Sequence, residues 1–508
     1  MVIRRLLERS PSEAALFKMT AIRKRVILVF FCLFILLCKK FYLDEKYRPE
    51  TGRVPDEVEG ICENPLEAGD HCFCKLKGQI DDCSCKVDTV DYFNNVKIFP
   101  RLLSLLRRDY FRFYKVNLNK ACPFWSDDSM CALKFCNVKP CKEEEIPPGL
   151  KGVDNHYNED MHVKYLESSQ NPQESECNSD SVDELGYLNM TISASAAKDF
   201  ELWNAHDTAQ DNFCTMPDDG SDAQYVDLML NPERYTGYKG DSAHRIWRSI
   251  YMENCFRPKN SYAEYIPSSK LNGLCLEKRA FYRVISGLHA SINIHLSANY
   301  LFTDKLAFSL TKSSEGDHWG HNLEEFKRRF SPEQTSLEGP QWLKNLYFLY
   351  LLELRAVAKA APYLSNDLYY TGNSMEDADT RTAIKDFLQV VSSFPDHFNE
   401  RSMFSGGQQA AKLKEEFRLH FHNISRIMDC VGCEKCKLWG KLQVQGLGTA
   451  LKILFSKKFD SINPLNVEKY RNNKTFHLER SEIVSLFNAL GRLSTSIHEI
   501  ENFRRMMR

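Results

Sequence analysis

Apolar positions recur at helical spacing along most of the second half of the chain. Residues 345–364 (NLYFLYLLELRAVAKAAPYL) form the longest strongly apolar stretch, and Pro362 is expected to end that helix. The same periodicity predicts further helices over residues 278–302, 413–428, 442–455 and 481–506. Alternating strand patterns are scarce, and residues 316–320 and 405–407 have the composition of loops. The chain is therefore expected to be mainly α, with little sheet.

A short apolar run near the N-terminus has basic residues on both sides. Arg23-Lys24-Arg25 precede residues 26–38, and Lys39-Lys40 follow them. A run of 13 apolar residues fits the core of a secretory signal better than a membrane span, which needs about 20. Residues 1–43 are therefore expected to be a targeting segment, either a cleaved signal or an anchor that keeps the protein at the membrane. Both readings place the rest of the chain in the lumen of the secretory pathway.

Composition divides the remaining chain into three regions. Residues 62–141 hold nine Cys and are expected to form a loop-rich region stapled by disulfides. Residues 142–184 contain 12 acidic residues against three lysines and are expected to be a mobile acidic loop. Cys177 lies alone inside this loop, where it is either a switch or an ordinary structural bridge. Residues 185–508 contain the predicted helices and are expected to form one large helical domain.

Charge and cysteine content narrow the function classes. With 67 Lys+Arg against 68 Asp+Glu, the formal net charge of −1 argues against general attraction to nucleic acid. The 18 Cys among 508 residues are too sparse for a small disulfide scaffold, but their clustering is typical of an oxidising compartment. The acceptor sequons at Asn189, Asn423 and Asn473 predict N-glycosylation and agree with a secretory address.

Three cysteine clusters carry candidate chemistry. The stretch HCFCKLKGQIDDCSC (71–85) suits two nested disulfides across a hairpin, with a zinc site as the less favoured rival. Cys131-x4-Cys136, with Cys141 close behind, has the spacing of an exposed loop disulfide that exchanges with another protein. Cys433-x2-Cys436 follows Cys430 at the start of a helical stretch.

A helix N-terminus changes the chemistry of a C-x-x-C pair. Cys433 and Cys436 at i and i+3 share one helix face, where the helix end stabilises a thiolate and favours cycling between dithiol and disulfide. A purely structural bridge has the same spacing, so the spacing leaves both readings open. An iron–sulfur run would need a further cysteine at position 440, which is Gly440. No metal site is expected.

A polar stripe marks an otherwise apolar helix. Ser286, His289 and Asn293 stand at i, i+3 and i+7, which suits either a ligand edge or an ordinary buried histidine. Upstream, Arg234 lies in a turn-rich loop and Trp247 follows it, a combination that suits a phosphate and a flat ring, or plain surface packing. The chain has no G-x-G-x-x-G, so a dinucleotide would not lie on a Rossmann crossover.

Several long stretches resemble the endoplasmic reticulum oxidoreductins, flavin-dependent thiol oxidases that reoxidise protein disulfide isomerase. The matching stretches are HCFCKLKGQIDDCSC (71–85), FPRLLSLLRRDYFRFYKVNL (99–118), YVDLMLNPERYTGYKG (225–240), EKRAFYRVISGLHASINIHLSANY (277–300), NLYFLYLLELRA (345–356) and ISRIMDCVGCEKCKLWGKLQVQGLGTALKILF (424–455). The resemblance implies a single helical FAD-binding domain in the lumen of the endoplasmic reticulum, with molecular oxygen as acceptor and hydrogen peroxide as product.

The resemblance also implies roles for individual residues. Cys131 and Cys136 resemble the shuttle pair that accepts electrons from the isomerase, and Cys433 and Cys436 resemble the inner pair beside the flavin. The implied FAD contacts are Arg234, Thr236, Trp247, Ser286, His289 and Arg329. Trp342 stands where the family has a further basic residue.

The family's disulfide pattern is implied in the same way. The structural bridges would be Cys72–Cys85, Cys74–Cys83, Cys122–Cys430 and Cys255–Cys275. The bridges Cys131–Cys177 and Cys136–Cys141 resemble regulatory locks on the shuttle pair, and no role is assigned to Cys62 or Cys214. The alternative function is a disulfide-stabilised lumenal interaction protein without redox turnover, which would not need a C-x4-C and a C-x-x-C together.

Overall fold

The chain divides into two compact units, Met1–Ile61 and Cys62–Arg508. The computed structural model describes parts of the second unit only: residues 73–76, 83–86, 95–125, 131, 133–151, 212–214, 222–234, 237–238, 241–256, 265–271, 274–302, 318–367, 369–392, 400–405, 408–456, 476 and 478–507. The predicted targeting segment, residues 1–43, lies outside these ranges. No helix in the described ranges is both long enough and apolar enough to cross a membrane.

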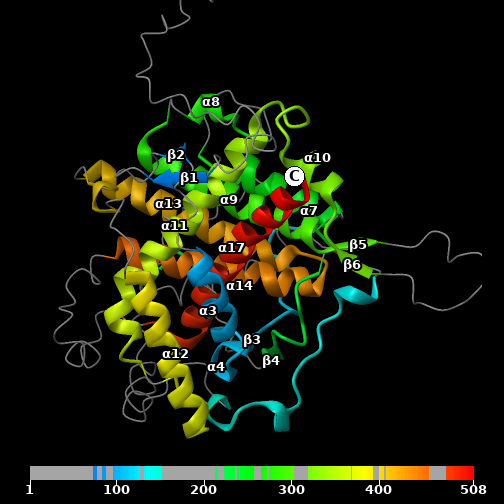
Figure 1. The fold of residues 1–508 in the computed structure, drawn as a ribbon. Helices are drawn as coiled ribbons and strands as arrows, with labels where there is room; N and C mark the ends of the chain where they lie inside the picture. Colours follow the sequence, from blue (N-terminus) through cyan, green and yellow to red (C-terminus); the bar gives the residue numbers. More distant parts are fainter. Residues whose placement is uncertain are drawn as a thin grey trace, which may run out of the picture. The chain divides into compact units, whose positions relative to one another are not determined.

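Helices dominate the described part of the chain (Figure 1). The α-helices are α3 (Asn95–Leu105), α4 (Asp109–Arg112), α7 (Asp241–Ser249), α8 (Ser268–Leu271), α9 (Leu276–Ala298), α10 (Leu323–Phe330), α11 (Glu338–Leu364), α12 (Ser374–Ser392), α13 (Gln408–Ile427), α14 (Glu434–Phe455) and α17 (Arg480–Met507). A π-helix, η8 (Ile250–Asn254), continues α7, and short 3-10 turns are η3 (Lys134–Cys136), η4 (Glu143–Glu145), η5 (Pro148–Leu150), η11 (Glu400–Ser402) and η12 (Met428–Cys430). The mainly α fold predicted from the sequence is confirmed.

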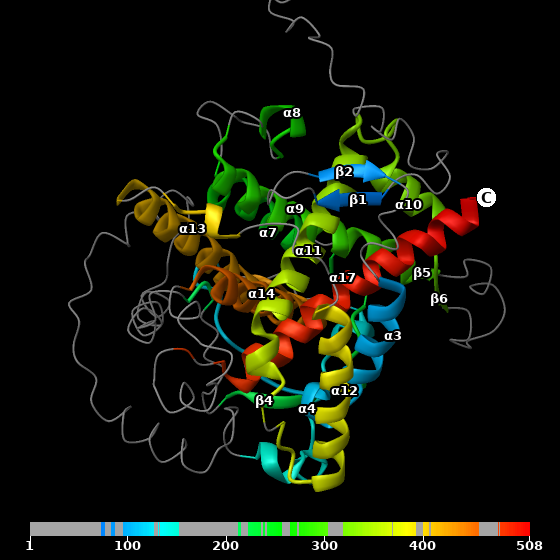
Figure 2. The ribbon, with the colours of Figure 1, turned by 60° about the vertical axis from the view of Figure 1, so that its left-hand side comes forward.

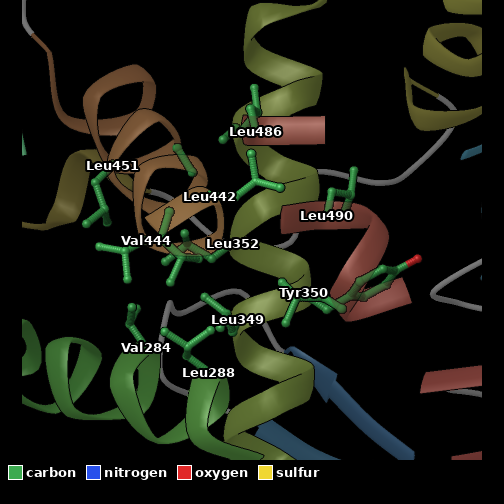
Figure 3. Packing of buried hydrophobic residues seen from close by; sticks show 14 of the residues in the cluster. Val284, Leu288, Leu349, Tyr350, Leu352, Leu442, Val444, Leu451, Leu486 and Leu490 are labelled. Atoms are coloured by element: carbon green, nitrogen blue, oxygen red, sulfur yellow. The ribbon is translucent and has the colours of Figure 1, made fainter. Parts of the chain in front are cut away.

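The core forms where four long helices meet. α11 packs against α9 and α14, and α17 packs against α14, α9 and α11 (Figure 2). Apolar side chains from all four helices interleave there, including Leu288, Leu352, Leu442 and Leu490 (Figure 3). Each of these side chains is at most 5% exposed, so their burial supplies the main hydrophobic stabilisation of the domain.

Gly446 lies where α14 and α17 approach most closely. A Cβ atom at this position would lie 2.5 Å from the Cβ of Ala489 and would overlap the carbonyl oxygen of Ser485, whereas real Cβ contacts are essentially never under 3.0 Å. The missing side chain therefore permits the close approach of the two helices, which in turn orients the start of α14.

A buried polar network sets the register of three helices. Asn95 of α3 accepts a hydrogen bond from Ser494 Oγ at 2.6 Å and from Tyr350 Oη at 3.1 Å, and its Nδ2 donates to the carbonyl oxygen of Ser494. Unpaired polar groups in such a core are costly, so only one relative placement of α3, α11 and α17 satisfies all three side chains.

Three small antiparallel ribbons accompany the helices. β1 (Phe73–Leu76) pairs with β2 (Cys83–Lys86), which agrees with the predicted hairpin. β3 (Phe113–Val116) pairs with β4 (Gln224–Asp227), and β5 (Tyr300–Phe302) pairs with β6 (His318–Gly320). The second ribbon matters most for the site, because β4 is also bridged on its other edge by Pro140.

Helix ends were predicted less well than helices. The helix expected over residues 278–302 ends at Ala298, and its last three residues form β5 because they pair with β6. That pairing also makes residues 318–320 a strand within the expected loop 316–320. The helices expected from 413, 442 and 345 begin earlier, at Gln408, Glu434 and Glu338. Pro362 lies inside the last turns of α11, which ends at Leu364.

The region expected to be an acidic loop begins inside the folded unit. Residues 143–145 and 148–150 form η4 and η5, and Leu150 is buried. The phenol of Tyr225 donates a hydrogen bond of 2.5 Å to the carbonyl oxygen of Leu150. The remainder of the expected loop, with Cys177, lies outside the described residues.

Glu353 is a buried carboxyl group in the middle of α11. It is fully buried, and neither carboxyl oxygen has a hydrogen-bond partner among the residues that the structure describes. Burial raises the pKa of this group well above 4.5. The carboxyl is therefore protonated in the folded protein at a pH where the unfolded chain has already released the proton.

Glu353→Gln should make the protein more stable at pH 8 than the wild type. As pH rises above 4.5 the unfolded state of the wild type loses a proton that the folded state keeps, so the free energy of unfolding falls until the raised pKa is passed. Guanidinium denaturation at pH 5 and pH 8, with disulfides intact, measures this difference. Glu324→Gln, whose side chain is 80% exposed, is the control. An identical pH dependence in wild type and Glu353→Gln would contradict the assignment.

Candidate functional site

Cys433 caps the N-terminus of α14. Its sulfur accepts a hydrogen bond from the backbone N–H of Cys436 at 3.3 Å, which is the N-cap arrangement usually made by Ser or Asp. The two cysteines are 2% and 1% exposed. The sequence folds this way because the helical pattern of α14 begins directly after the cysteine, so both sulfurs lie on one face of the first turn.

The two sulfurs of this C-x-x-C pair differ in acidity. A hydrogen bond from the Cys436 side chain lowers the pKa of Cys433, and the backbone N–H groups of Cys436 and Lys435 add to this against the opposing effect of burial. Burial raises the pKa of Cys436 well above 9.0. The pair is therefore a hydrogen-bonded dithiol in which Cys433 carries the thiolate character and is the stronger nucleophile.

The C-x4-C pair forms a disulfide beside this thiolate. Cys131 and Cys136 are bonded, with η3 forming the last turn of the segment between them. The sulfurs of Cys131, Cys136 and Cys433 all lie within 4.8 Å of one another. Such a cluster of sulfurs also suits a metal ion, but a bonded disulfide offers no thiolate ligands, so the oxidised arrangement favours exchange over metal binding.

A second disulfide explains why these distant segments meet. Cys122 is bonded to Cys430 across a sequence separation of 308 residues. Lys437 Nζ donates to the carbonyl oxygen of Leu118, and Lys441 Nζ donates to that of Asn117, both at 3.0 Å. The chain leading to Cys131 is thus fastened on both sides of the C-x-x-C pair, by Cys430 before it and by two lysines of α14 after it.

A cavity lies beside Cys436. Its lining includes Trp247, Tyr238, Glu233 and Gly237 together with Cys436. The phenol of Tyr238 donates to Glu233 at 2.6 Å, and Glu233 also forms an ion pair with buried Arg492 of α17. The cavity is therefore apolar around the sulfur and has a fixed carboxylate at one wall.

Aromatic side chains extend from this cavity along α9. The rings of Trp247 and His289 stack at a centroid distance of 3.9 Å, and Tyr265 stacks on the other side of His289 at 5.8 Å. Burial and then the charge of Arg329 lower the pKa of His289 to about 3, so its ring is neutral. Trp342 contacts Tyr265 at a ring-centroid distance of 6.0 Å and so enlarges this aromatic surface.

Two arginines close to this surface have unusual environments. Arg329 donates to Asn293 Oδ1 at 2.5 Å, but its buried Nε has no hydrogen-bond partner among the described residues. Arg234 lies over the ring of Trp319 at 5.1 Å. Burial lowers the pKa of both guanidinium groups; for Arg329 this outweighs the opposing effect of Glu325, whose carboxylate lies 3.4 Å from the guanidinium. Both are suited to binding a phosphate group.

The polar residues of the stripe on α9 contact other side chains of the protein. Ser286 accepts a hydrogen bond from Asn345 Nδ2 at 2.9 Å, and Asn293 is held by Arg329. His289 faces Trp247. The structure therefore brings Trp247, His289 and Arg329 near one another and gives Ser286 a partner in α11, while Thr236 lies outside the described residues.

One implied structural bridge is absent. Cys255 is buried in the core, whereas Cys275 is exposed with a free thiol at the N-terminus of α9, and no bond joins these two described residues. The two cysteines are thus not bonded to each other in this structure, and their pairing stays a prediction from the resemblance. Cys141 is a half-buried free thiol, since Cys136 is bonded to Cys131.

The remaining implied sites have mixed outcomes. The backbone register of the first ribbon sets Cys74 opposite Cys85 and Leu76 opposite Cys83. Cys72 lies outside the described residues, as do Asn189 and Asn473. Asn423 is half-buried within α13 and its sequon residue Ser425 is 2% exposed, which is not the exposed loop that a glycan needs.

Sequence reasoning missed several residues of the site. Glu233 and Tyr238 line the cavity, Arg492 donates a hydrogen bond to Glu233, and Glu434 lies between the two cysteines of the C-x-x-C pair. Glu233 precedes Arg234 and Glu434 follows Cys433 in the sequence, and this proximity to predicted site residues was the signal that could have identified them. Arg492 had none, because its role depends on where α17 crosses the site.

Comparison with known proteins gives a consistent result. The family model for Endoplasmic Reticulum Oxidoreductin 1 (ERO1) matches residues 97–500. The chain is 53% identical to the Ero1-like protein of Drosophila melanogaster over 450 residues, which cover 87% of this chain and 92% of that protein. It is 49% identical to ERO1-like protein alpha of Homo sapiens over 460 residues, covering 87% and 93%. A double cysteine-to-alanine mutant of Ero1p from S. cerevisiae has a similar fold, with a TM-score of 0.50, 28% identity and coverage of 82% of this chain and 98% of that chain.

Gly237→Ala should disturb the C-x-x-C pair. Gly237 has a φ of 91°, and a Cβ there would lie 2.6 Å from Cys433 Sγ and 2.7 Å from Cys436 Sγ. The variant should shift the glutathione equilibrium of the Cys433–Cys436 pair by about tenfold, because on the order of 1.4 kcal/mol of clash and strain falls on these sulfurs. Mass spectrometry of alkylated peptides measures the equilibrium.

Gly372→Ala is the matched control. Gly372 also has a positive φ, of 86°, but its nearest neighbours are Gly149 and Pro148. Both variants should lose similar folding stability from backbone strain. An equal shift of the Cys433–Cys436 equilibrium in both would show that strain, not contact with the sulfurs, is responsible.

Proposed function

Because the chain belongs to the endoplasmic reticulum oxidoreductin 1 family of thiol oxidases, which support oxidative protein folding in the endoplasmic reticulum, we propose that it reoxidises protein disulfide isomerase. Cys131 and Cys136 receive the electrons and Cys433 and Cys436 pass them on. The single observation that carries this proposal is the convergence of three sulfurs within 4.8 Å from segments about 300 residues apart in sequence. A disulfide-stabilised interaction protein would have no use for this convergence.

The first exchange takes place at the outer disulfide. Cys131 is half-buried and Cys136 is 2% exposed, so a thiolate of reduced isomerase attacks Cys131 and Cys136 leaves as the thiolate. The second isomerase thiol then resolves the mixed disulfide. The isomerase gains one disulfide, and the C-x4-C pair gains two electrons and two protons.

The second exchange moves the electron pair inward. A thiolate of the reduced C-x4-C pair attacks Cys433 of the oxidised C-x-x-C pair, which lies nearest, and Cys436 is the leaving group. The second thiol of the C-x4-C pair then displaces Cys433 from the mixed disulfide, which leaves a bonded Cys131–Cys136 pair and a Cys433–Cys436 dithiol, the same bonding as in the structure. Because Cys436 lines the cavity, the reduced C-x-x-C pair then lies next to the cavity.

FAD is the cofactor that the residues around this cavity suit. Trp247 and His289 would stack on its aromatic ring, and Arg329, with its buried Nε lacking an acceptor, would bind a phosphate together with Arg234. Thr236 and Ser286 are the remaining proposed contacts. When bound, FAD supplies the two-electron acceptor that delivers the electrons to molecular oxygen as hydrogen peroxide. Buried, neutral His289 adds no charge to this surface.

We place the activity on the lumenal side of the endoplasmic reticulum. The sequence pattern of residues 1–43 and the cysteine clustering support that side, because thiol exchange of this kind needs an oxidising compartment. Membrane association would depend on whether residues 1–43 are retained.

Cys433→Ala should keep the flavin and lose turnover. The variant should remain yellow, since Cys433 faces the C-x4-C disulfide rather than the cavity, while oxygen consumption with reduced protein disulfide isomerase should fall to background. Cys214→Ala is the control and should retain both. Normal oxygen consumption in Cys433→Ala would refute the assignment of the inner pair, and a colourless protein that FAD cannot reconstitute would refute the cofactor.

Cys177→Ala should be more active at the start of the reaction. A Cys131–Cys177 bridge would occupy the outer cysteine and prevent the first exchange, so its loss should shorten the lag in oxygen consumption. Asn189→Gln, a substitution in the same stretch of chain, is the control. A lag and rate equal to those of the wild type would remove Cys177 from the regulation.

A further inference from the structure

The loop of residues 131–141, called here the C-x4-C loop, is fastened to the catalytic core by a row of hydrogen bonds. The backbone N–H of Val138 donates to the Glu434 carboxylate at 2.9 Å. The backbone of Lys139 makes two bonds with the Asn231 side chain: its N–H donates to Oδ1 at 2.8 Å, and its carbonyl oxygen accepts from Nδ2 at 2.9 Å. Trp439 Nε1 donates a hydrogen bond of 2.8 Å to the backbone carbonyl oxygen of Asn231. This bond anchors Asn231 to α14.

The end of the loop continues as an edge strand. Pro140 forms an antiparallel bridge with Val226 of β4, and the N–H of Cys141 donates to the carbonyl oxygen of Tyr225 at 2.8 Å. This pairing keeps the Cys141 thiol beside β4. Burial and the nearby Asp227 raise the pKa of that thiol to about 11, so the docked loop holds Cys141 as a weak nucleophile.

The beginning of the loop makes an aromatic contact. The ring of Phe135, within the C-x4-C motif, meets Trp319 of β6 edge-on at 5.4 Å, and Trp319 in turn lies under Arg234. In Figure 1 this cyan segment runs beside the β5–β6 ribbon. Contacts therefore flank Cys136 on both sides, and they position the Cys131–Cys136 disulfide against Cys433.

We propose that Glu434 and Asn231 are positioning residues that form a docking clasp for the C-x4-C loop. The proposal deepens the proposed function: with the clasp closed, the loop disulfide lies within exchange distance of Cys433, and with it open, the loop presents Cys131 to an external dithiol protein. Glu434 lies between Cys433 and Cys436 in the sequence, so the residue that grips the loop moves with the pair that the loop must reach.

The two halves of the clasp differ in strength. Asn231 is 0% exposed and makes paired backbone bonds, which gives a fixed hold. Glu434 is exposed, and a hydrogen bond in contact with water contributes only on the order of 1 kcal/mol. The Glu434 contact is therefore the one that opens in each catalytic cycle without loss of the fold.

The experiment measures docking directly, without flavin turnover. A full-length background variant with Cys136→Ala, Cys177→Ala and Cys436→Ala leaves Cys131 and Cys433 as the two thiols at the junction. The protein is equilibrated under argon with reduced and oxidised glutathione, and the fraction of the Cys131–Cys433 disulfide is measured by mass spectrometry. The equilibrium constant reports the effective concentration of the docked loop.

Glu434→Ala in this background should lower that equilibrium constant about fivefold, because the Val138 N–H loses its acceptor. Glu434→Gln should keep it within about twofold, because the amide oxygen still accepts the bond. Glu416→Ala, an exposed acid on α13, should leave it unchanged.

Two results would overturn the clasp. One is an unchanged equilibrium constant in Glu434→Ala. The other is an equal loss in Glu434→Gln, which would assign the effect to the charge beside Cys433 instead of the hydrogen bond. Neither depends on oxygen consumption, so failure of the clasp is distinguishable from failure of the proposed oxidase activity, which the wild-type oxygen assay tests.

Discussion

Thiol–disulfide exchange requires direct contact between sulfur atoms. The proposed electron transfer therefore depends on a fold that holds the two cysteine pairs together. The bond between Cys122 and Cys430 supplies that constraint, because each half of it stands just before one of the pairs. Cys131 lies nine positions after Cys122, so it can move no further than about 30 Å from this anchor. Movement of the outer pair is therefore limited by the length of this segment. The segment is fixed at its start, where two lysines of α14 bind the carbonyl oxygens of residues 117 and 118.

The sequence predicted the secondary structure correctly where the local periodicity of apolar residues determines it. The apolar stripes of α11, α14 and α17 are long enough that burial and helix propensity agree. Residues 300–302 continue the apolar pattern of α9 yet become a strand, because a partner at residues 318–320 is available only in the folded chain. The early start of α13 was missed for a related reason: its first residues are polar and carry no periodic signal.

The sequence predicted individual residues of the site but not how the fold brings them together. Spacing marked Cys433 and Cys436 as candidates for redox chemistry, and the N-cap geometry agrees with the local argument. The approach of Cys131 to this pair was implied only by the resemblance, because it depends on a long-range disulfide that local spacing does not reveal. Glu434 and Asn231 look like ordinary surface and turn residues until the C-x4-C loop lies against them. The Cys255–Cys275 pairing, which the resemblance alone supplied, is not formed in the structure.

The sulfur that caps α14 has one more consequence. A thiolate at Cys433 is a better acceptor for the Cys436 N–H than a neutral disulfide sulfur, so the first turn of the helix is more stable when the pair is reduced. Stabilising the reduced form raises the reduction potential of the pair. In the proposed relay, this helix end would favour electron transfer from the reduced C-x4-C pair to the Cys433–Cys436 disulfide.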